Sequence, residues 1–240
     1  MSSVETHYER LLAPIYLWMA GGIDNAVALG ASDIADLLPR VGFAVDLGAG
    51  FGMHTIPLAR AGHKVLAIDS SAYLLEQLRS YTADMPVTVV SADLLRFSEH
   101  LPPHQQVDLI LCMGDTLTHL PTAEAISELA EAVAATLRLG GRFISTFRDY
   151  TVMPAGPSRF IPVQSDSDRI HMCFLEEVGN HVVVHDILHQ RKDNKWTMQI
   201  SNYEKLRISA HEVCRLFRAA GLKASVAPGP RGKVKVVADA

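Results

Sequence analysis

The sequence predicts an α/β fold: a doubly wound, mostly parallel sheet with an antiparallel β insertion and N-terminal helices. Two observations carry this prediction. Short apolar runs alternate with helical patterns over residues 41–148, and a β-rich stretch without helical periodicity follows over residues 149–208. The 240 residues are 48% hydrophobic and 20% charged, which is typical of a globular protein and excludes a disordered or fibrous chain.

Residues 1–40 are predicted to form a helical cap. Apolar side chains recur there at helix-like intervals in two stretches, the first of which is interrupted by Pro14. Their positions are Leu11, Leu12, Ile15 and Trp18 in the first stretch and Ile23, Val27, Ala31, Ile34 and Leu38 in the second. We therefore expect helices ahead of the sheet.

Residues 41–148 are predicted to form the core, with buried strands and covering helices. The runs expected as strands are Phe43–Leu47, Val65–Ile68, Val87–Val90, Leu109–Cys112 and Arg142–Thr146. Helical periodicity between them is carried by Leu74, Leu75 and Leu78, and later by Ile126, Leu129, Val133 and Leu137. Gly140 and Gly141 are expected to end the last of these helices. Alternation of this kind places helices on both faces of a parallel sheet.

The C-terminal part is divided into the β insertion, residues 149–208, and the last helix with the closing strands, residues 209–240. The β-rich runs of the insertion are His181–His189 and Trp196–Leu206. Ser209 and Glu212 have the spacing of a capping box, so a helix is expected to begin there. Lys233–Ala238 is expected as a closing strand, with its lysines on the solvated face of a sheet edge.

Charge and cysteine usage limit the setting and the partners. The net charge of −4 gives no general attraction to nucleic acid or to an anionic membrane. The three cysteines lie far apart, the N-terminus lacks the pattern of a secretory signal, and no apolar run reaches 18 residues. We therefore expect a cytoplasmic protein without a nucleic-acid or membrane partner, and the oligomeric state is left open.

The candidate chemistry begins where the first predicted strand enters a glycine-rich turn. Asp46 precedes Gly48, Gly50 and Gly52, so the spacing of the glycines is G-x-G-x-G. Glycine permits positive φ and lets a ligand approach the backbone closely. The spacing differs from the G-x-G-x-x-G of dinucleotide sites, and a carboxylate beside the loop suits a positively charged ligand better than a pyrophosphate. NAD is thus disfavoured but stays an alternative.

Two further carboxylates follow the next two predicted strands. Asp69 stands where a carboxylate can accept hydrogen bonds from both hydroxyls of a ribose, the alternative being that Asp69 and Ser70 only cap the next helix. Asp93 can accept from the exocyclic amine of adenine, or else serve as a turn residue. With Asp46, these carboxylates fit a nucleoside that also bears a positive charge.

Taken as a set, these motifs resemble the class I S-adenosylmethionine-dependent methyltransferases. The resemblance covers roughly residues 43–147 and rests on the glycine-rich loop, Asp69, Asp93, Val107–Ile110 and Leu139–Gly141. It implies a Rossmann-like, seven-stranded sheet with S-adenosylmethionine as the cofactor, over which the N-terminal helices close. The cofactor-binding residues that it implies are Tyr16, Asp46, Gly48, Ala49, Gly50, Asp69, Ser70, Ala92, Asp93, Leu94, Met113 and Gly114. For Tyr16 the alternative is simple packing against the sheet.

The resemblance extends to a predicted acceptor site. Cys112–Pro121 is similar to the Gly-Asn-x-x-x-His-Leu-Pro stretch of glycine and sarcosine N-methyltransferases, with Asp115 in place of the asparagine. His119 either orients a substrate or caps the following helix. Arg148-Asp149-Tyr150 is similar to their Arg-Asn-Tyr, whose arginine holds the acceptor carboxylate; an ion pair with the adjacent aspartate is the alternative. The acceptor-site residues implied are Asp115, His119, Arg148 and Tyr150.

The function predicted is methyl transfer from S-adenosylmethionine to a small molecule. In-line transfer needs mainly positioning, so no catalytic residue is nominated. The specific hypothesis is N-methylation of a carboxylate-bearing amine. The alternatives are O- or C-methylation of a phenolic or natural-product acceptor, and a protein that binds S-adenosylmethionine without transferring its methyl group. No metal is expected, because neighbours among His181, His185 and His189 would lie about 13 Å apart along a strand.

Overall fold

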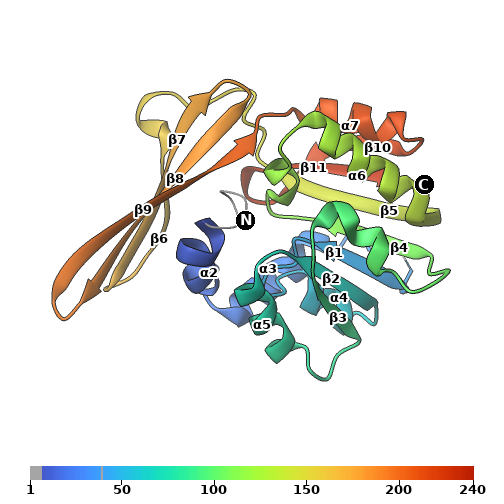
Figure 1. Cartoon of the computed structure of the whole chain (residues 1–240), viewed down its shortest axis with the longest axis horizontal. Helices are drawn as coiled ribbons and strands as arrows, with labels where there is room; N and C mark the ends of the chain where they lie inside the picture. Colours follow the sequence, from blue (N-terminus) through green and yellow to red (C-terminus); the bar gives the residue numbers. More distant parts are fainter. Residues whose placement is uncertain (1–6, 39) are drawn as a thin grey trace.

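The computed structural model describes residues 7–38 and 40–240, so residues 1–6 and 39 of the predicted helical cap lie outside it. The chain forms a seven-stranded sheet with helices on both faces and a separate four-stranded antiparallel sheet, which projects to the left in Figure 1. The predicted fold class is confirmed.

The large sheet has the strand order β10-β11-β5-β4-β1-β2-β3. Its strands are β1 (Phe43–Leu47), β2 (Lys64–Asp69), β3 (Val87–Ser91), β4 (Val107–Cys112), β5 (Leu137–Phe147), β10 (Lys223–Pro228) and β11 (Val234–Asp239). In the part of the sheet ordered β5-β4-β1-β2-β3, neighbouring strands run parallel. Strand β11 is antiparallel to both of its neighbours, β5 and β10. Strand β11 therefore lies inside the sheet, and the expectation that its lysines mark a sheet edge is wrong.

Helices bury both faces of this sheet. The helical elements are η1 (Tyr8–Leu12), α2 (Ala13–Met19), α3 (Ile23–Ile34), α4 (Thr55–Arg60), α5 (Ala72–Tyr81), η2 (Leu94–His100), η3 (Thr116–His119), α6 (Ala123–Thr136), η4 (Gly156–Arg159), α7 (Ala210–Ala219) and η5 (Pro230–Gly232). Alternate residues of β1 enter different clusters: Val45 and Leu47 pack with α6 and α7, and Ala44 packs with α3 and α4. This alternation with no exposed face explains the continuous apolar runs in the sequence.

Two local predictions near the end of α6 need correction. Gly140 and Gly141 do not end the helix, which stops at Thr136, but lie inside β5. Gly140 has φ +77°, its N–H donates to the carbonyl of Ala240, and the N–H of Ala240 donates to the carbonyl of Gly141. The glycine pair thus forms an irregularity in the strand at which the chain end docks.

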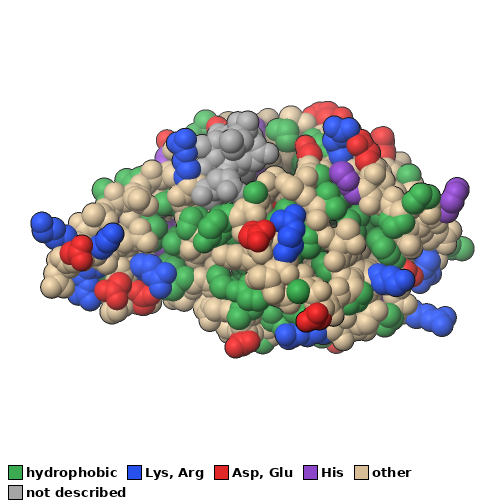
Figure 2. Space-filling view, turned by 60° about the horizontal axis from the view of Figure 1, so that its bottom comes forward, with side chains coloured by type: hydrophobic (Ala, Val, Ile, Leu, Met, Phe, Trp, Pro, Cys, Tyr) green, Lys and Arg blue, Asp and Glu red, His purple; other side chains and the backbone are tan. Residues whose placement is uncertain are grey.

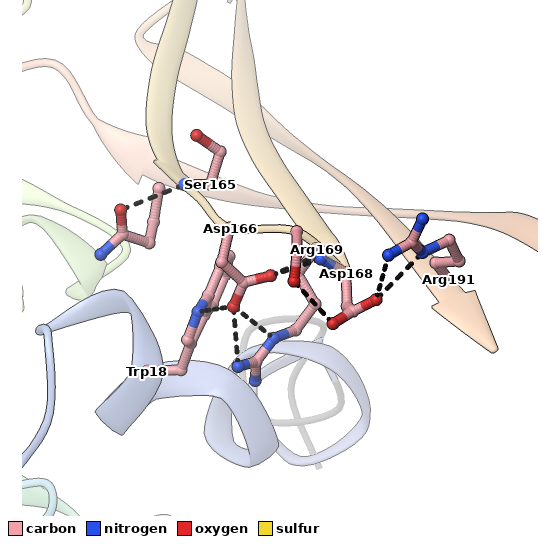
Figure 3. A network of polar contacts seen from close by, with 8 residues as sticks. Trp18, Ser165, Asp166, Asp168, Arg169 and Arg191 are labelled. Carbon is pink, nitrogen blue, oxygen red and sulfur yellow. Dashed lines mark hydrogen bonds and ion pairs between the residues drawn. The ribbon is translucent and has the colours of Figure 1, made fainter. Parts of the chain in front are cut away.

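The small sheet is the predicted insertion. It consists of β6 (Phe160–Ser165), β7 (Arg169–Val178), β8 (His181–Lys192) and β9 (Lys195–Leu206) in that order. Trp18 of α2 reaches the turn between β6 and β7, where its Nε1 donates to Asp166 Oδ2 over 2.7 Å, and the Arg169 guanidinium stacks on its ring at 4.4 Å (Figure 3). The N-terminal helix is thereby fastened to the insertion.

The surface and the helix lengths complete the description. Figure 2 shows acidic and basic side chains interspersed over the face it presents, with both signs at the outer end of the insertion.

Among the described residues no single helix is long and apolar enough to cross a membrane. The bent pair Arg10–Met19 and Ile23–Ile34, at 81°, would qualify only when taken together by length and composition.

Candidate active site

A cavity of about 540 Å³ lies at the carboxyl ends of the parallel strands. It opens where the strand order reverses, between β1 and β4, which is the usual ligand position in doubly wound sheets. The turns after these strands supply Gly48–Phe51, Asp69–Ser71, Ala92–Leu95 and Met113–Gly114. Helix α2 adds Tyr16, η3 adds His119, and the insertion adds His181, Glu204 and Leu206.

The glycine-rich loop after β1 has a conformation that glycine alone tolerates well. Gly48 has φ +74°, and a Cβ there would lie 2.5 Å from the Thr116 side chain. Gly50 has φ +54°, and a Cβ at this position would meet only Leu74, at 3.8 Å. The loop thus packs tightly against η3 at Gly48 and leaves room over its backbone at Gly50, which suits a ligand that lies against the loop.

Asp69 ties the end of β2 to this loop. Its Oδ2 accepts from the Gly50 N–H and its Oδ1 from the Ser71 N–H, both over 2.8 Å. Burial raises the pKa of Asp69, although these hydrogen bonds oppose the rise. Each oxygen keeps a further lone pair, so the carboxylate can hold the loop and still accept from ligand hydroxyls. Ser71, not Ser70, caps α5, accepting from the Leu74 N–H at 3.3 Å.

The other two aspartates of the glycine-loop region differ in their surroundings. Asp93 is exposed, lines the cavity, and caps η2 by accepting from the Leu95 N–H at 2.9 Å. Asp46 is buried and accepts from the Thr55 hydroxyl at 2.6 Å, and burial raises its pKa. It is not among the lining residues of the cavity.

The lining of the cavity is acidic. Among its described residues there are three carboxylates, Asp69, Asp93 and Glu204, and no lysine or arginine. A pyrophosphate would meet carboxylates without a compensating cation, whereas a nucleoside with a sulfonium and an ammonium group meets opposite charge. The lining therefore fits S-adenosylmethionine: its carboxylates can accept from the ribose and the adenine, and the glycine loop leaves room for the ligand. The same lining does not fit the pyrophosphate of NAD.

A second, positively charged cluster forms around Asp115, directly after the lining residue Gly114. Asp115 is buried, and its carboxylate accepts from the Arg148 N–H at 2.6 Å, from Arg148 Nη1 at 2.5 Å and from Lys205 Nζ at 3.0 Å. Burial opposes ionisation, but Lys205 and Arg148, with Lys233 beyond them, hold the pKa of Asp115 well below its usual range. Three basic groups thus surround one carboxylate.

Aromatic rings join this cluster to the cavity. The Tyr203 ring lies 5.4 Å from the His119 ring, and Lys205 Nζ lies 5.5 Å from the centroid of Tyr203. Burial and the charge of Lys205 lower the pKa of His119 to about 3, so its imidazole is neutral at neutral pH. On the opposite side, the Tyr16 ring packs edge-on against Phe51 at 5.8 Å, and burial raises the pKa of Tyr16 to about 12.

The structure brings most of the predicted site together. Of the predicted cofactor residues, all but Asp46 line the cavity, and His119 lines it as well. Asp115, Arg148 and Tyr150 lie outside the lining, and Arg148 pairs with Asp115 and not with Asp149. Sequence reasoning missed Lys205, because the apolar side chains of the same strand, such as Met198 and Ile200, alternate with it and so assign Lys205 to the polar face.

Comparison with known proteins agrees with this geometry. Residues 44–141 match the family described as "Methyltransferase domain". They form a class I methyltransferase domain. The predicted resemblance is thereby confirmed. A glycine/sarcosine N-methyltransferase of Aphanothece halophytica is 25% identical over 111 residues, and the match spans 45% of this chain but only 41% of that relative.

Solved structures extend the likeness from the methyltransferase domain to the insertion. The CcbJ methyltransferase of Streptomyces caelestis superposes with a TM-score of 0.78 at 19% identity, covering 98% of both chains. Streptomyces venezuelae DesVI also gives 0.78, at 20% identity, covering 95% of this chain and 97% of that one. At such identities these structures show a shared fold over the parts of the chain that they cover.

Proposed function

We propose that this protein transfers a methyl group from S-adenosylmethionine to the nitrogen of a small amine that also carries a carboxylate. The observation that carries the proposal is the separation of charge across the site. The cavity lining is acidic, and the cluster around Asp115 holds three basic groups against one carboxylate. An acceptor with an amine at one end and a carboxylate at the other matches both.

The cofactor would occupy the part of the cavity formed by the turns after β1 to β3. The loop Gly48–Gly50 would support its methionine part, Asp69 would accept from the ribose hydroxyls, and Asp93 would accept from the adenine amine. When bound, S-adenosylmethionine supplies an electrophilic methyl group on its sulfonium. The chain then has to orient the acceptor nitrogen, which requires no dedicated nucleophile.

The acceptor would lie between η3, the end of β5 and the insertion. The Arg148 side chain is 41% exposed and uses one guanidinium nitrogen on Asp115, so its other N–H groups can donate to a carboxylate. Burial and the charge of Arg148 lower the pKa of Lys233 to about 8, which leaves it largely protonated at pH 7. Neutral His119 can accept a hydrogen bond from an N–H of the amine, which fixes the direction of its lone pair.

The names of related proteins support nitrogen as the acceptor atom. The curated relative is a glycine/sarcosine N-methyltransferase. Two of the structural neighbours are named a sugar N-methyltransferase and a glycopeptide N-methyltransferase. All three names specify methyl transfer to nitrogen, which supports nitrogen as the acceptor atom. The second part of the proposal, a carboxylate on the acceptor, is supported by the basic cluster around Asp115.

The test is methyl transfer from labelled S-adenosylmethionine to matched acceptors: an amino acid, the same amine without its carboxylate, and a phenolic acid. We expect N-methylation of the amino acid type and a large loss without the carboxylate. Arg148→Ala should raise the acceptor KM about 10- to 150-fold, the equivalent of about 1.5–3 kcal/mol for a charged hydrogen bond. Arg96→Ala, on the exposed surface, is the control and should leave KM unchanged.

Other outcomes would overturn the proposal in distinct ways. An unchanged KM for Arg148→Ala would remove the carboxylate contact. Methylation of the phenol alone would establish an oxygen acceptor. Binding of S-adenosylhomocysteine without transfer to any acceptor would point to a non-catalytic binding protein, and tighter binding of NAD would refute the cofactor.

A further inference from the structure

Three side chains with metal-binding atoms meet on the face of the insertion sheet that packs against the N-terminal segment. His171 and Cys173 are two residues apart on β7, so they share a face, and Asp186 is the partner of Cys173 on β8. One donor atom from each lies within 4.8 Å of the other two. His171 Nε2 lies 2.7 Å, and Cys173 Sγ 3.0 Å, from Asp186 Oδ1. Among the described residues, no other set of His, Cys, Asp and Glu satisfies this condition.

We propose that His171, Cys173 and Asp186 bind a Zn²⁺ ion. An imidazole, a thiolate and a carboxylate are all ligands that Zn²⁺ accepts, whereas Mg²⁺ and Ca²⁺ select oxygen alone. With neutral imidazole, the two anionic ligands balance the charge of the dication. Three protein ligands leave one tetrahedral position for water.

A second layer of contacts holds the carboxylate in place. The other oxygen of Asp186, Oδ2, lies 2.8 Å from Nε2 of His7, and His7 Nδ1 lies 2.6 Å from the hydroxyl of Ser201. Ser201 is the partner of Asp186 on β9, so the sheet register places the two residues side by side and His7 contacts both of them. Hydrogen-bonded carboxylate ligands of this kind orient the metal-binding oxygen.

The electrostatics of the cluster also favour a cation. Asp186 and His171 are buried, and Cys173 is half-buried. Burial and the neighbouring Asp186 raise the pKa of Cys173, because two anions would otherwise meet in a poorly solvated place. A bound dication removes that conflict and converts the thiol to a thiolate. Lys205 and Arg148 lie within electrostatic reach of Cys173: their positive charges favour its thiolate and weaken the attraction for a cation, and both pair with Asp115.

The position of the cluster predicts a structural role for the ion. The N-terminal segment that contributes His7 also contributes Tyr16 to the cavity wall. A metal bound to Asp186 would strengthen the attachment of this segment to the insertion at His7. The Trp18–Asp166 hydrogen bond attaches the same segment to the insertion at a second point. The sequence-based expectation of no metal considered histidines along a single strand, whereas these ligands come from two strands. The inference does not depend on the proposed methyl transfer.

The test is titration of the metal-free, full-length protein with Co²⁺ and then Zn²⁺. We expect one equivalent of Co²⁺ with tetrahedral d–d bands and a thiolate-to-cobalt charge-transfer band, both of which Zn²⁺ displaces. Cys173→Ser should abolish the charge-transfer band, and His7→Ala should weaken binding about 10- to 100-fold. The control is Cys214→Ser, which removes a buried thiol of α7 and should leave the spectrum unchanged.

The wild-type titration decides the matter even where a variant does not fold. Binding of less than a tenth of an equivalent, or a cobalt spectrum without the thiolate band, would show that the cluster is held by hydrogen bonds alone. A charge-transfer band that persists in Cys173→Ser would place the metal elsewhere. Calorimetry with S-adenosylhomocysteine on the same samples reports the cofactor site separately, so failure of the metal proposal is distinguishable from failure of the proposed function.

Discussion

The substitution Asp115→Asn tests the electrostatic design of the acceptor side. In the wild-type protein the Asp115 carboxylate lies 3.0 Å from Lys205 Nζ and 2.5 Å from Arg148 Nη1. The Lys205 side chain is only 8% exposed, whereas that of Arg148 is 41% exposed. Asparagine preserves the shape and an acceptor oxygen but removes the charge. Lys205 then loses the carboxylate that pairs with it among the described residues, while Arg148 can turn toward water.

The expected loss follows from these burials. Removing one partner of a buried ion pair typically costs about 3–5 kcal/mol, and the exposed part of the pair contributes under about 1 kcal/mol. Asparagine keeps an oxygen that can accept from Lys205 Nζ, which places the loss in the lower part of this range. We therefore expect a destabilisation of about 3–4 kcal/mol, or roughly 6–16 °C in Tm for a chain of this size.

Urea unfolding at pH 7.5 measures this loss. The double variant Asp115→Asn/Lys205→Met removes the unpaired charge and should recover stability to within about 1 kcal/mol of the wild type. Asp239→Asn, in a half-exposed pair with Arg142, is the control and should cost under about 1 kcal/mol. A single variant within about 0.5 kcal/mol of the wild type, or a double variant no more stable than the single one, would refute the reasoning.

Three further predictions concern the cofactor loop and acid stability. Asp69→Ala should weaken S-adenosylhomocysteine binding about 10- to 150-fold by calorimetry, and an unchanged affinity would exclude the ribose contact. Gly48→Ala should lower Tm and cofactor affinity more than Gly179→Ala, because both have positive φ but only Gly48 would clash, with Thr116 at 2.5 Å; equal effects would contradict the close packing. The lowered pKa of Asp115 means that its stabilisation is complete above the unfolded-state pKa of about 3.9 and is lost as the pH falls through the folded-state pKa. The stability difference between wild type and Asp115→Asn should therefore narrow below about pH 4 in acid titrations, and a constant difference would contradict the shift.

The sequence predicted those parts of the fold that depend on local periodicity. Strand β1 was expected at Phe43–Leu47 and is found there, and Ser209 accepts from the Glu212 N–H as the capping pair implied. What local patterns could not reveal is which distant segments pair. Gly140 and Gly141 fit a helix end equally well, and only docking of the chain terminus at Ala240 decides against it. The interior position of β11 is likewise set by its two neighbours, not by its own residues.

For the site, too, local patterns were predictable from the sequence and contacts between distant segments were not. Parallel strands bring their carboxyl ends to one sheet edge, so the turns that contain Asp69 and Asp93 could be grouped from the sequence alone. Lys205 lies 90 residues from Asp115, and no local pattern connects them. In the sequence, Asp115 is the one departure noted from the asparagine of the similar acceptor motif. In the structure its negative charge pairs with the buried Lys205.

The N-terminal segment connects the cavity to the proposed acceptor site, so we expect binding of the cofactor and of the acceptor to be coupled. Tyr16 lines the cavity and packs on Phe51 of the glycine loop, while Trp18, two residues later, bonds to Asp166 in the insertion. His7 of the same segment contacts Asp186, and its ring centroid lies 4.6 Å from that of Tyr203. The Tyr203 centroid in turn lies 5.4 Å from that of His119 in the cavity wall. A movement of the insertion on acceptor binding would therefore displace a wall of the cavity. Because binding free energies are reciprocal, any gain in acceptor affinity that the cofactor produces must equal the gain in cofactor affinity that the acceptor produces.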